Sequence, residues 1–218
     1  MTQHFFIFNF FRLMNFASKS ISFTLLKFLL VFFSFVFTNP IFAEENLYDR
    51  GKELVEQKEY QKAIKAFEFA AKAGNLDALT ALGVMHIGGI GVEQNNSKGY
   101  QYIREAADKS DPKAQYTLGA LYYLGAGVEK DYKKAFNWLN LASEQNYIDA
   151  KYNLAVMYEF GEGVEQSFEK AYQYYLFAAR RDNLESQIKV ADMYRDGIGT
   201  DKDLDKSAYW LKRIEDSK

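Results

Sequence analysis

The sequence feature that most constrains the fold is a short motif that returns with a period of 36 residues. Its central copy is Leu118-Gly119-x-x-Tyr122-x-x-Gly125-x-Gly127-Val128, followed by Trp138. The other copies hold, in the same slots, Leu82, Gly83, His86, Gly89, Gly91, Val92 and Tyr102; Leu154, Ala155, Tyr158, Gly161, Gly163, Val164 and Tyr174; and Val190, Ala191, Tyr194, Gly197, Gly199, Thr200 and Trp210. Such self-similarity is typical of a solenoid, in which each unit buries its open face against its neighbours.

This pattern resembles the Sel-1-like repeat family, which is related to the tetratricopeptide repeats. The resemblance implies an all-α fold, a right-handed α-solenoid of helix-turn-helix repeats. The full repeats are predicted at residues 79-114, 115-150, 151-186 and 187-218. Residues 44-78 are predicted to form a shorter starting repeat of tetratricopeptide type, with helices at 47-58 and 61-73 and no Gly-x-Gly loop between them.

Local signals predict where the helices of each repeat begin and end. The two loop glycines are predicted to supply positive φ values, which side chains with a Cβ disfavour. The second helix begins at a slot occupied by good N-cap residues: Asn95, Asp131, Ser167 and Asp203. It ends at Gly74, Ser110, Asn146 and Asp182. The small residue at Gly83, Gly119, Ala155 and Ala191 is predicted to let the two helices approach closely, against Tyr102, Trp138, Tyr174 and Trp210.

Helical geometry assigns the faces of the first helix of each repeat, because successive residues turn by about 100°. One stripe carries Leu or Val, Met or Leu, and Tyr or His in every copy, so it is predicted to be buried. His86 belongs to this stripe and is predicted to be a core residue. The opposite face holds Thr80, Val84 and Ile87 in the first full repeat. In the later repeats it holds Tyr116, Ala120, Tyr123, Tyr152, Val156, Glu159, Ile188, Asp192 and Arg195.

In the family, the first helices line the concave side of the superhelix. The resemblance therefore implies a groove floored by the nine residues of the later repeats, with Leu124 and Phe160 extending it. Tyrosines can cover a partner with apolar area and still offer a hydroxyl group. The predicted ligand is an extended peptide or a partner helix. The alternative is that these tyrosines pack between neighbouring helices and bind nothing.

Composition excludes several functional classes. The chain has no cysteine, and its two histidines are His4 and His86, so zinc sites and Ser-His or Cys-His catalysis are not expected. The net charge is −2 and no basic run occurs, which argues against nucleic-acid binding. The Gly-x-Gly loops follow helices and lack a Gly-Lys-Ser/Thr tail, so they are not phosphate-binding loops. No metal site and no cofactor is predicted.

The first 43 residues have the pattern of a secretory signal peptide. Lys19 and Lys27 precede the apolar run at 28-37, and Pro40 and Ala43 end the segment before two glutamates. We predict cleavage after Ala43, and the pattern also fits translation that begins at Met14. The alternative is an uncleaved inner-membrane anchor at residues 21-42, with the membrane contacted only through this segment.

The predicted function is that of an exported, non-catalytic bacterial scaffold, periplasmic or secreted, that binds a protein or peptide. One alternative is a cell-envelope regulator that binds peptidoglycan or its synthases. Another comes from cysteine-rich relatives described as weak β-lactamase or β-lactam-binding proteins. This chain lacks their cysteines and has no Ser-x-x-Lys motif.

Overall fold

The structure is a computed structural model that describes the backbone of residues 40–216 and the side chains of residues 47–216. The chain divides into two units, residues 1–46 and residues 47–218. The predicted signal peptide, the start at Met14 and the alternative anchor lie outside the described residues, except for the backbone of residues 40–43. No helix among the described residues is long and apolar enough to span a membrane.

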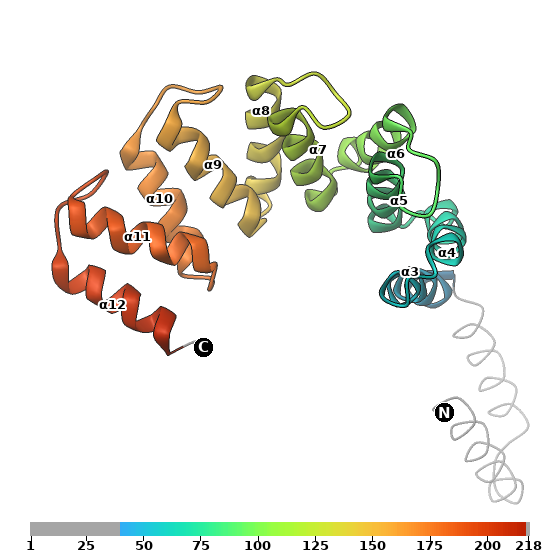
Figure 1. The fold of residues 1–218 in the computed structure, drawn as a ribbon, viewed down its shortest axis with the longest axis horizontal. Coiled ribbons are helices and arrows are strands. Elements are labelled where there is room, and N and C mark those ends of the chain that lie inside the picture. Colours follow the sequence, from blue (N-terminus) through green and yellow to red (C-terminus); the bar gives the residue numbers. More distant parts are fainter. Residues whose placement is uncertain (1–39, 217–218) are drawn as a thin grey trace, which may run out of the picture. The chain divides into compact units, whose positions relative to one another are not determined.

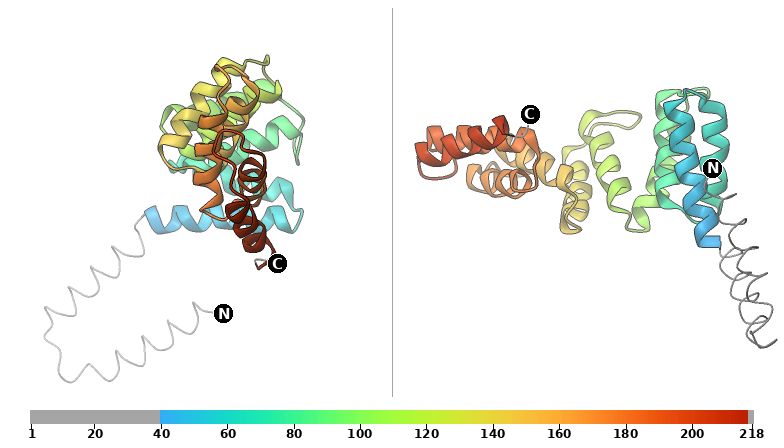
Figure 2. Two further views of the ribbon diagram at one scale, coloured as in Figure 1. Left: turned by 90° about the vertical axis from the view of Figure 1, so that its left-hand side faces the viewer. Right: turned by 90° about the horizontal axis from the view of Figure 1, so that it is seen from below.

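All regular structure within residues 40–216 is helical, which confirms the prediction of an all-α repeat fold. The helices are α3 (Pro40–Glu56), α4 (Tyr60–Lys72), α5 (Leu76–Gly88), α6 (Asn96–Asp108), α7 (Pro112–Leu124), α8 (Tyr132–Glu144), α9 (Ile148–Phe160), α10 (Phe168–Ala179), α11 (Leu184–Asp196) and α12 (Leu204–Glu215). From α5 onward they form pairs that follow one another in chain order (Figure 1). The right-hand view of Figure 2 shows the same order.

We call the first helix of each pair helix A and the second helix B. The side chains of the predicted N-cap residues accept hydrogen bonds from the backbone three residues on in all four helices B, for example Asp131 from the amide of Lys134 at 2.9 Å. Asn75, Asp111 and Asn183 cap helices A in the same way, whereas Tyr147 at the start of α9 does not. The predicted ends of helix B also hold, because Ser110, Asn146 and Asp182 adopt φ values of 65°, 63° and 63°.

The two glycines of each loop have different tasks. The first, as at Gly125, adopts a left-handed φ of 72° and ends helix A. The second lies against the start of helix B in the preceding repeat. A Cβ on Gly163 would collide with the carbonyl of Tyr132, and one on Gly199 with the carbonyl of Phe168. The loop thus closes one repeat and packs it on the one before.

The small residue in helix A permits close packing within a repeat, but the predicted partner is wrong by one position. A Cβ on Gly119 would lie 2.7 Å from Cγ of Leu139, and one on Gly83 would collide with Ile103. Tyr102 and Tyr174, two of the four rings predicted as partners, stack on the buried stripe instead. Tyr102 stacks on His86 with ring centroids 5.7 Å apart.

The core runs along the stack as a series of clusters that join adjacent pairs. The predicted stripe is buried in each full repeat, as shown by Leu118, Leu121 and Tyr122 in α7. Consecutive helices make the main contacts, and α5 also packs on α7. Hydroxyl pairs join neighbouring repeats at this stripe: Tyr122 meets Tyr100 of α6 with 2.9 Å between the oxygens. Burial and the Tyr100 hydroxyl raise the pKa of Tyr122 to about 12.

Substituting the two kinds of loop glycine separates backbone strain from packing. Gly125→Ala is expected to lower the free energy of unfolding by about 1–2 kcal/mol, because a left-handed φ disfavours a Cβ. Gly163→Ala is expected to lower it further, because its φ of 73° is similar but its Cβ would also strike the Tyr132 backbone. Urea unfolding followed by circular dichroism measures both, and equal losses would contradict the inter-repeat contact.

Candidate functional site

The predicted binding residues lie on three successive helices A, and we call this surface the A-helix face. It comprises Tyr116, Ala120 and Tyr123 on α7, Tyr152, Val156 and Glu159 on α9, and Ile188, Asp192 and Arg195 on α11. Ile188 and Arg195 are exposed, and the other seven are half-buried. Thr80, which the same helical face holds in α5, is buried and donates its hydroxyl to the Leu76 carbonyl at 3.2 Å.

The three tyrosines of the A-helix face are engaged by neighbouring residues. The Tyr123 hydroxyl donates to Oε2 of Glu162 at 2.6 Å, a residue of the next repeat's loop. The Tyr116 ring lies 5.1 Å from that of Tyr147. The Tyr152 ring lies 5.7 Å from that of Tyr175, which belongs to α10. Burial, followed by the bond to Glu162, raises the pKa of Tyr123, so this hydroxyl stays a donor.

Glu159 is the centre of a polar cluster that joins α9, α10 and α11. Its carboxylate accepts a hydrogen bond from the buried hydroxyl of Tyr175 at 2.6 Å. It also forms an ion pair with Lys189, whose Nζ lies 2.9 Å and 3.0 Å from its two oxygens. Burial and this carboxylate raise the pKa of Tyr175. The Glu159 carboxylate therefore stabilises the packing of α9 against α10 and α11. Its oxygens already have hydrogen-bond partners within the chain.

Charge on the A-helix face is concentrated at the end of α11. Arg195 lies 2.5 Å from Oδ1 of Asp192 and 2.8 Å from Oδ2 of Asp196. These carboxylates raise the pKa of the Arg195 guanidinium, so it remains charged. Such exposed pairs are solvated and contribute little to stability.

Two highly exposed apolar side chains lie beside the A-helix face, at the last residues of α7 and α9. Leu124 is 68% exposed and Phe160 is 62% exposed, and they occupy the same slot of consecutive repeats. Val84 on α5 and Ile188 on α11 are also exposed. The sequence placed Leu124 and Phe160 beside the groove rather than at its centre.

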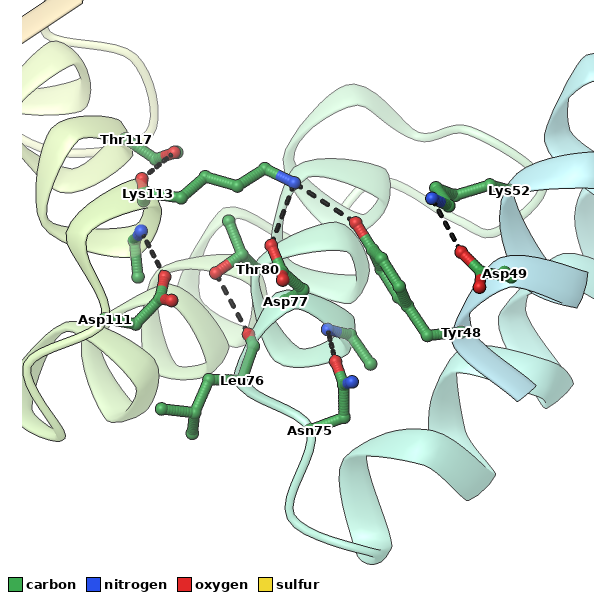
Figure 3. Close-up of polar contacts among 12 residues, drawn as sticks. Tyr48, Asp49, Lys52, Asn75, Leu76, Asp77, Thr80, Asp111, Lys113 and Thr117 are labelled. Carbon is green, nitrogen blue, oxygen red and sulfur yellow. Dashed lines mark hydrogen bonds and ion pairs between the residues drawn. The ribbon is translucent and has the colours of Figure 1, made fainter. Parts of the chain in front are cut away.

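A second polar contact between helices A, besides that of Glu159 with Lys189, was not predicted from the sequence. Nζ of Lys113 lies 3.0 Å from Oδ1 of Asp77 and 3.1 Å from the Tyr48 hydroxyl, so it joins α7, α5 and α3 (Figure 3). Burial opposes the charge of Lys113, but the bonds to Tyr48 and Asp77 raise its pKa. Asp77 and Lys113 are one period apart, and opposite charges at that spacing are the signal that could have revealed the pair.

His86, the histidine within the described residues, is buried as predicted. Its Nδ1 has no hydrogen-bond partner among those residues. Burial, followed by Lys98, lowers its pKa, while Glu68 acts in the opposite direction. Residues 47–216 contain no group of acidic or histidine side chains that could hold a metal ion.

Removing the Glu159 carboxylate tests its structural task. Glu159→Ala is expected to lower the free energy of unfolding by about 1–3 kcal/mol, because it leaves the Tyr175 hydroxyl buried without a partner. Lys189→Ala, which removes the partly solvated partner, is expected to lower it by less than about 1 kcal/mol. Denaturant unfolding of both variants measures the difference, and a loss for Lys189→Ala as large as that for Glu159→Ala would refute this assignment.

Protonation of His86 is expected to destabilise the fold. Because its pKa is lowered in the folded chain, the unfolded chain binds the proton more tightly. Stability should therefore be complete above the ordinary pKa of about 6.5 and should fall as the pH drops below it. His86→Tyr, the residue of the other full repeats, should flatten this dependence. Unfolding free energies between about pH 5.5 and about pH 7.5 provide the measurement; an unchanged slope in the variant would be inconsistent with this origin.

Solved structures share the fold. A protective antigen of uropathogenic Escherichia coli with an SLR fold is 29% identical, with a TM-score of 0.72 over 80% of this chain and 38% of that one. A Sel1 repeat protein from Oxalobacter formigenes is 28% identical, with a TM-score of 0.73 over 80% of this chain and 73% of its own length. The present chain thus spans well under half of the antigen. Among curated proteins, none matches this sequence.

The family model for the Sel1 repeat matches residues 46–75, 76–111, 112–147, 148–183 and 184–214. The last four of these ranges begin where helices A begin, whereas the full repeats taken from the sequence begin at 79, 115, 151 and 187. The matches cover most of the chain and all the helix pairs described above. The chain belongs to the Sel1 repeat family.

Proposed function

We propose that this protein is a non-catalytic scaffold that binds an extended segment of another protein along the A-helix face and the adjoining side chains of Leu124 and Phe160. The observation that supports it is the repeated exposure of Leu124 and Phe160 at equivalent ends of α7 and α9. Sel1 repeats are commonly protein–protein interaction scaffolds, which is consistent with this assignment.

The chemistry of the A-helix face favours a ligand with apolar anchors. Its polar groups are already used, since Tyr123 donates to Glu162 and Glu159 binds Tyr175 and Lys189. The exposed apolar side chains retain unburied area, and covering a Leu or Phe side chain contributes about 1.5–3 kcal/mol. The packed tyrosines beside them are held in place, so little conformational entropy is lost on binding.

Export is part of the same proposal. The segment at residues 1–43 carries the basic flank, apolar run and small residue of a signal peptide. A scaffold exported in this way would meet its partner in the periplasm or outside the cell.

Selection from a displayed library of random peptides tests the binding surface. Peptides with spaced apolar residues should be enriched on the native protein. Leu124→Ser and Phe160→Ser should each weaken the selected peptides by about tenfold or more, because each removes an apolar contact of about 1.5–3 kcal/mol. Fluorescence polarisation with a labelled peptide gives the dissociation constants.

Phe69→Ser is the matched control for this experiment. Phe69 is 61% exposed, lies on α4 and has Lys72 over its ring, as Phe160 has Lys189. It should leave peptide binding unchanged. An equal loss for Phe69→Ser, or full binding by the Leu124 and Phe160 variants, would rule out the A-helix face as the docking surface.

A further inference from the structure

A cationic cavity lies within the repeat at 148–183, away from the A-helix face. It has a volume of about 300 Å³ and is lined by Lys151, Tyr158, Lys170, Gln173, Tyr174 and Phe177. The first two lining residues come from α9 and the others from α10. Two of its lining residues are lysines, and none of them is acidic.

Lys170 forms no ion pair with any described residue, because the N-cap of its helix is uncharged. In the preceding repeat the equivalent Lys134 pairs with the N-cap Asp131 at 3.2 Å, and in the following repeat Lys206 pairs with Asp203 at 2.9 Å. Here the cap is Ser167, which still accepts from the Lys170 amide at 3.3 Å but carries no charge. The Ser167 side chain therefore caps α10 as the aspartates cap α8 and α12, but it offers no carboxylate to pair with Lys170.

Lys151 is a cation at a slot that is neutral in the neighbouring repeats. Gln115 and Gln187 occupy that slot and donate to the carbonyls of Ala107 and Ala179 at 3.4 Å and 3.2 Å. Lys151 instead reaches the Ser143 hydroxyl at 3.5 Å and pairs with no carboxylate among the described residues. Burial, followed by Arg181, lowers its pKa, against a weaker opposite effect of Glu144.

Aromatic rings hold both ammonium groups in place. The rings of Tyr158 and Tyr174 stack with centroids 5.6 Å apart. Nζ of Lys170 lies 5.1 Å from the centroid of Tyr158, and Nζ of Lys151 lies 4.2 Å from that of Phe177. Attraction to the ring faces fixes these cations without neutralising them.

We infer that this cavity binds an acidic peptide segment, with a carboxylate between Lys151 and Lys170 and an adjacent apolar side chain against Tyr174, because Lys151 and Arg181 already lie over the ring of Phe177. Two cations that pair with no carboxylate among residues 47–216 select a negative charge. The aromatic wall offers apolar area that a bare inorganic anion would leave uncovered. The cavity and the A-helix face share no residue, so this site stands independently of the scaffold function proposed above.

The test uses the full chain and a labelled short peptide of alternating glutamate and phenylalanine. The peptide should bind, and its glutamine counterpart should bind about tenfold or more weakly, because a charge-assisted hydrogen bond contributes about 1.5–3 kcal/mol. Lys151→Gln and Lys170→Gln should each cause a similar loss. Lys134→Gln is the matched control and should have no effect, since Lys134 is already paired with Asp131.

Ser167→Asp provides a variant that keeps the fold. Aspartate is a good N-cap, so helix α10 should be retained, and the new carboxylate should pair with Lys170 and weaken the acidic peptide about tenfold. Unchanged binding by Ser167→Asp and Lys170→Gln, equal binding of the glutamine peptide, or no binding of the acidic peptide would overturn the proposal. Competition by inorganic phosphate at the peptide's own affinity would also overturn it, because the cavity would then accept a bare oxyanion.

Discussion

The stack depends on the close approach between the second loop glycine of one repeat and the first residues of helix B in the repeat before it. Gly91, Gly163 and Gly199 meet Tyr60, Tyr132 and Phe168 in this way. At these three glycines the contact involves backbone atoms and helps to set the register of neighbouring repeats, whereas Gly127 lies against the side chain of Asn96. This contact and the hydroxyl pairs at the buried stripe both join adjacent repeats, as expected for a solenoid, in which each repeat packs only on its neighbours.

This packing between repeats determines which side chains remain exposed. Side chains between successive helices A are drawn into the interfaces, which is why Tyr123 and Glu159 are bonded within the chain. The ends of helices A are not covered by the next repeat, and Leu124 and Phe160 stay exposed there. The surface left exposed along the A-helix face and at Leu124 and Phe160 is therefore mainly apolar, although the face itself is rich in hydroxyl groups.

The sequence predicts the repeat architecture well because its signals are local and recur. Asp131 caps a helix, Gly125 takes a left-handed φ and Leu118 is buried for reasons contained within one repeat. The contacts of the candidate site are harder to predict from the sequence, because they join different repeats. Helical periodicity placed Tyr123 and Glu159 on one face, but it could not show that Glu162 and Lys189 would reach them. It also assigned the partner of Gly119 to Trp138 rather than to Leu139, since one residue of rotation decides which side chain lies in the interface.

The N-cap residue of helix B must accept a hydrogen bond from the backbone amide three residues later, and several residue types can do so. Asn95, Asp131, Ser167 and Asp203 all accept the backbone amide, yet only two of them carry a charge. Aspartate and serine are thus nearly interchangeable for the helix but opposite in their influence on the lysine three positions later. Each unit of such an array can consequently evolve its own electrostatic character through a single exchange that leaves the architecture untouched.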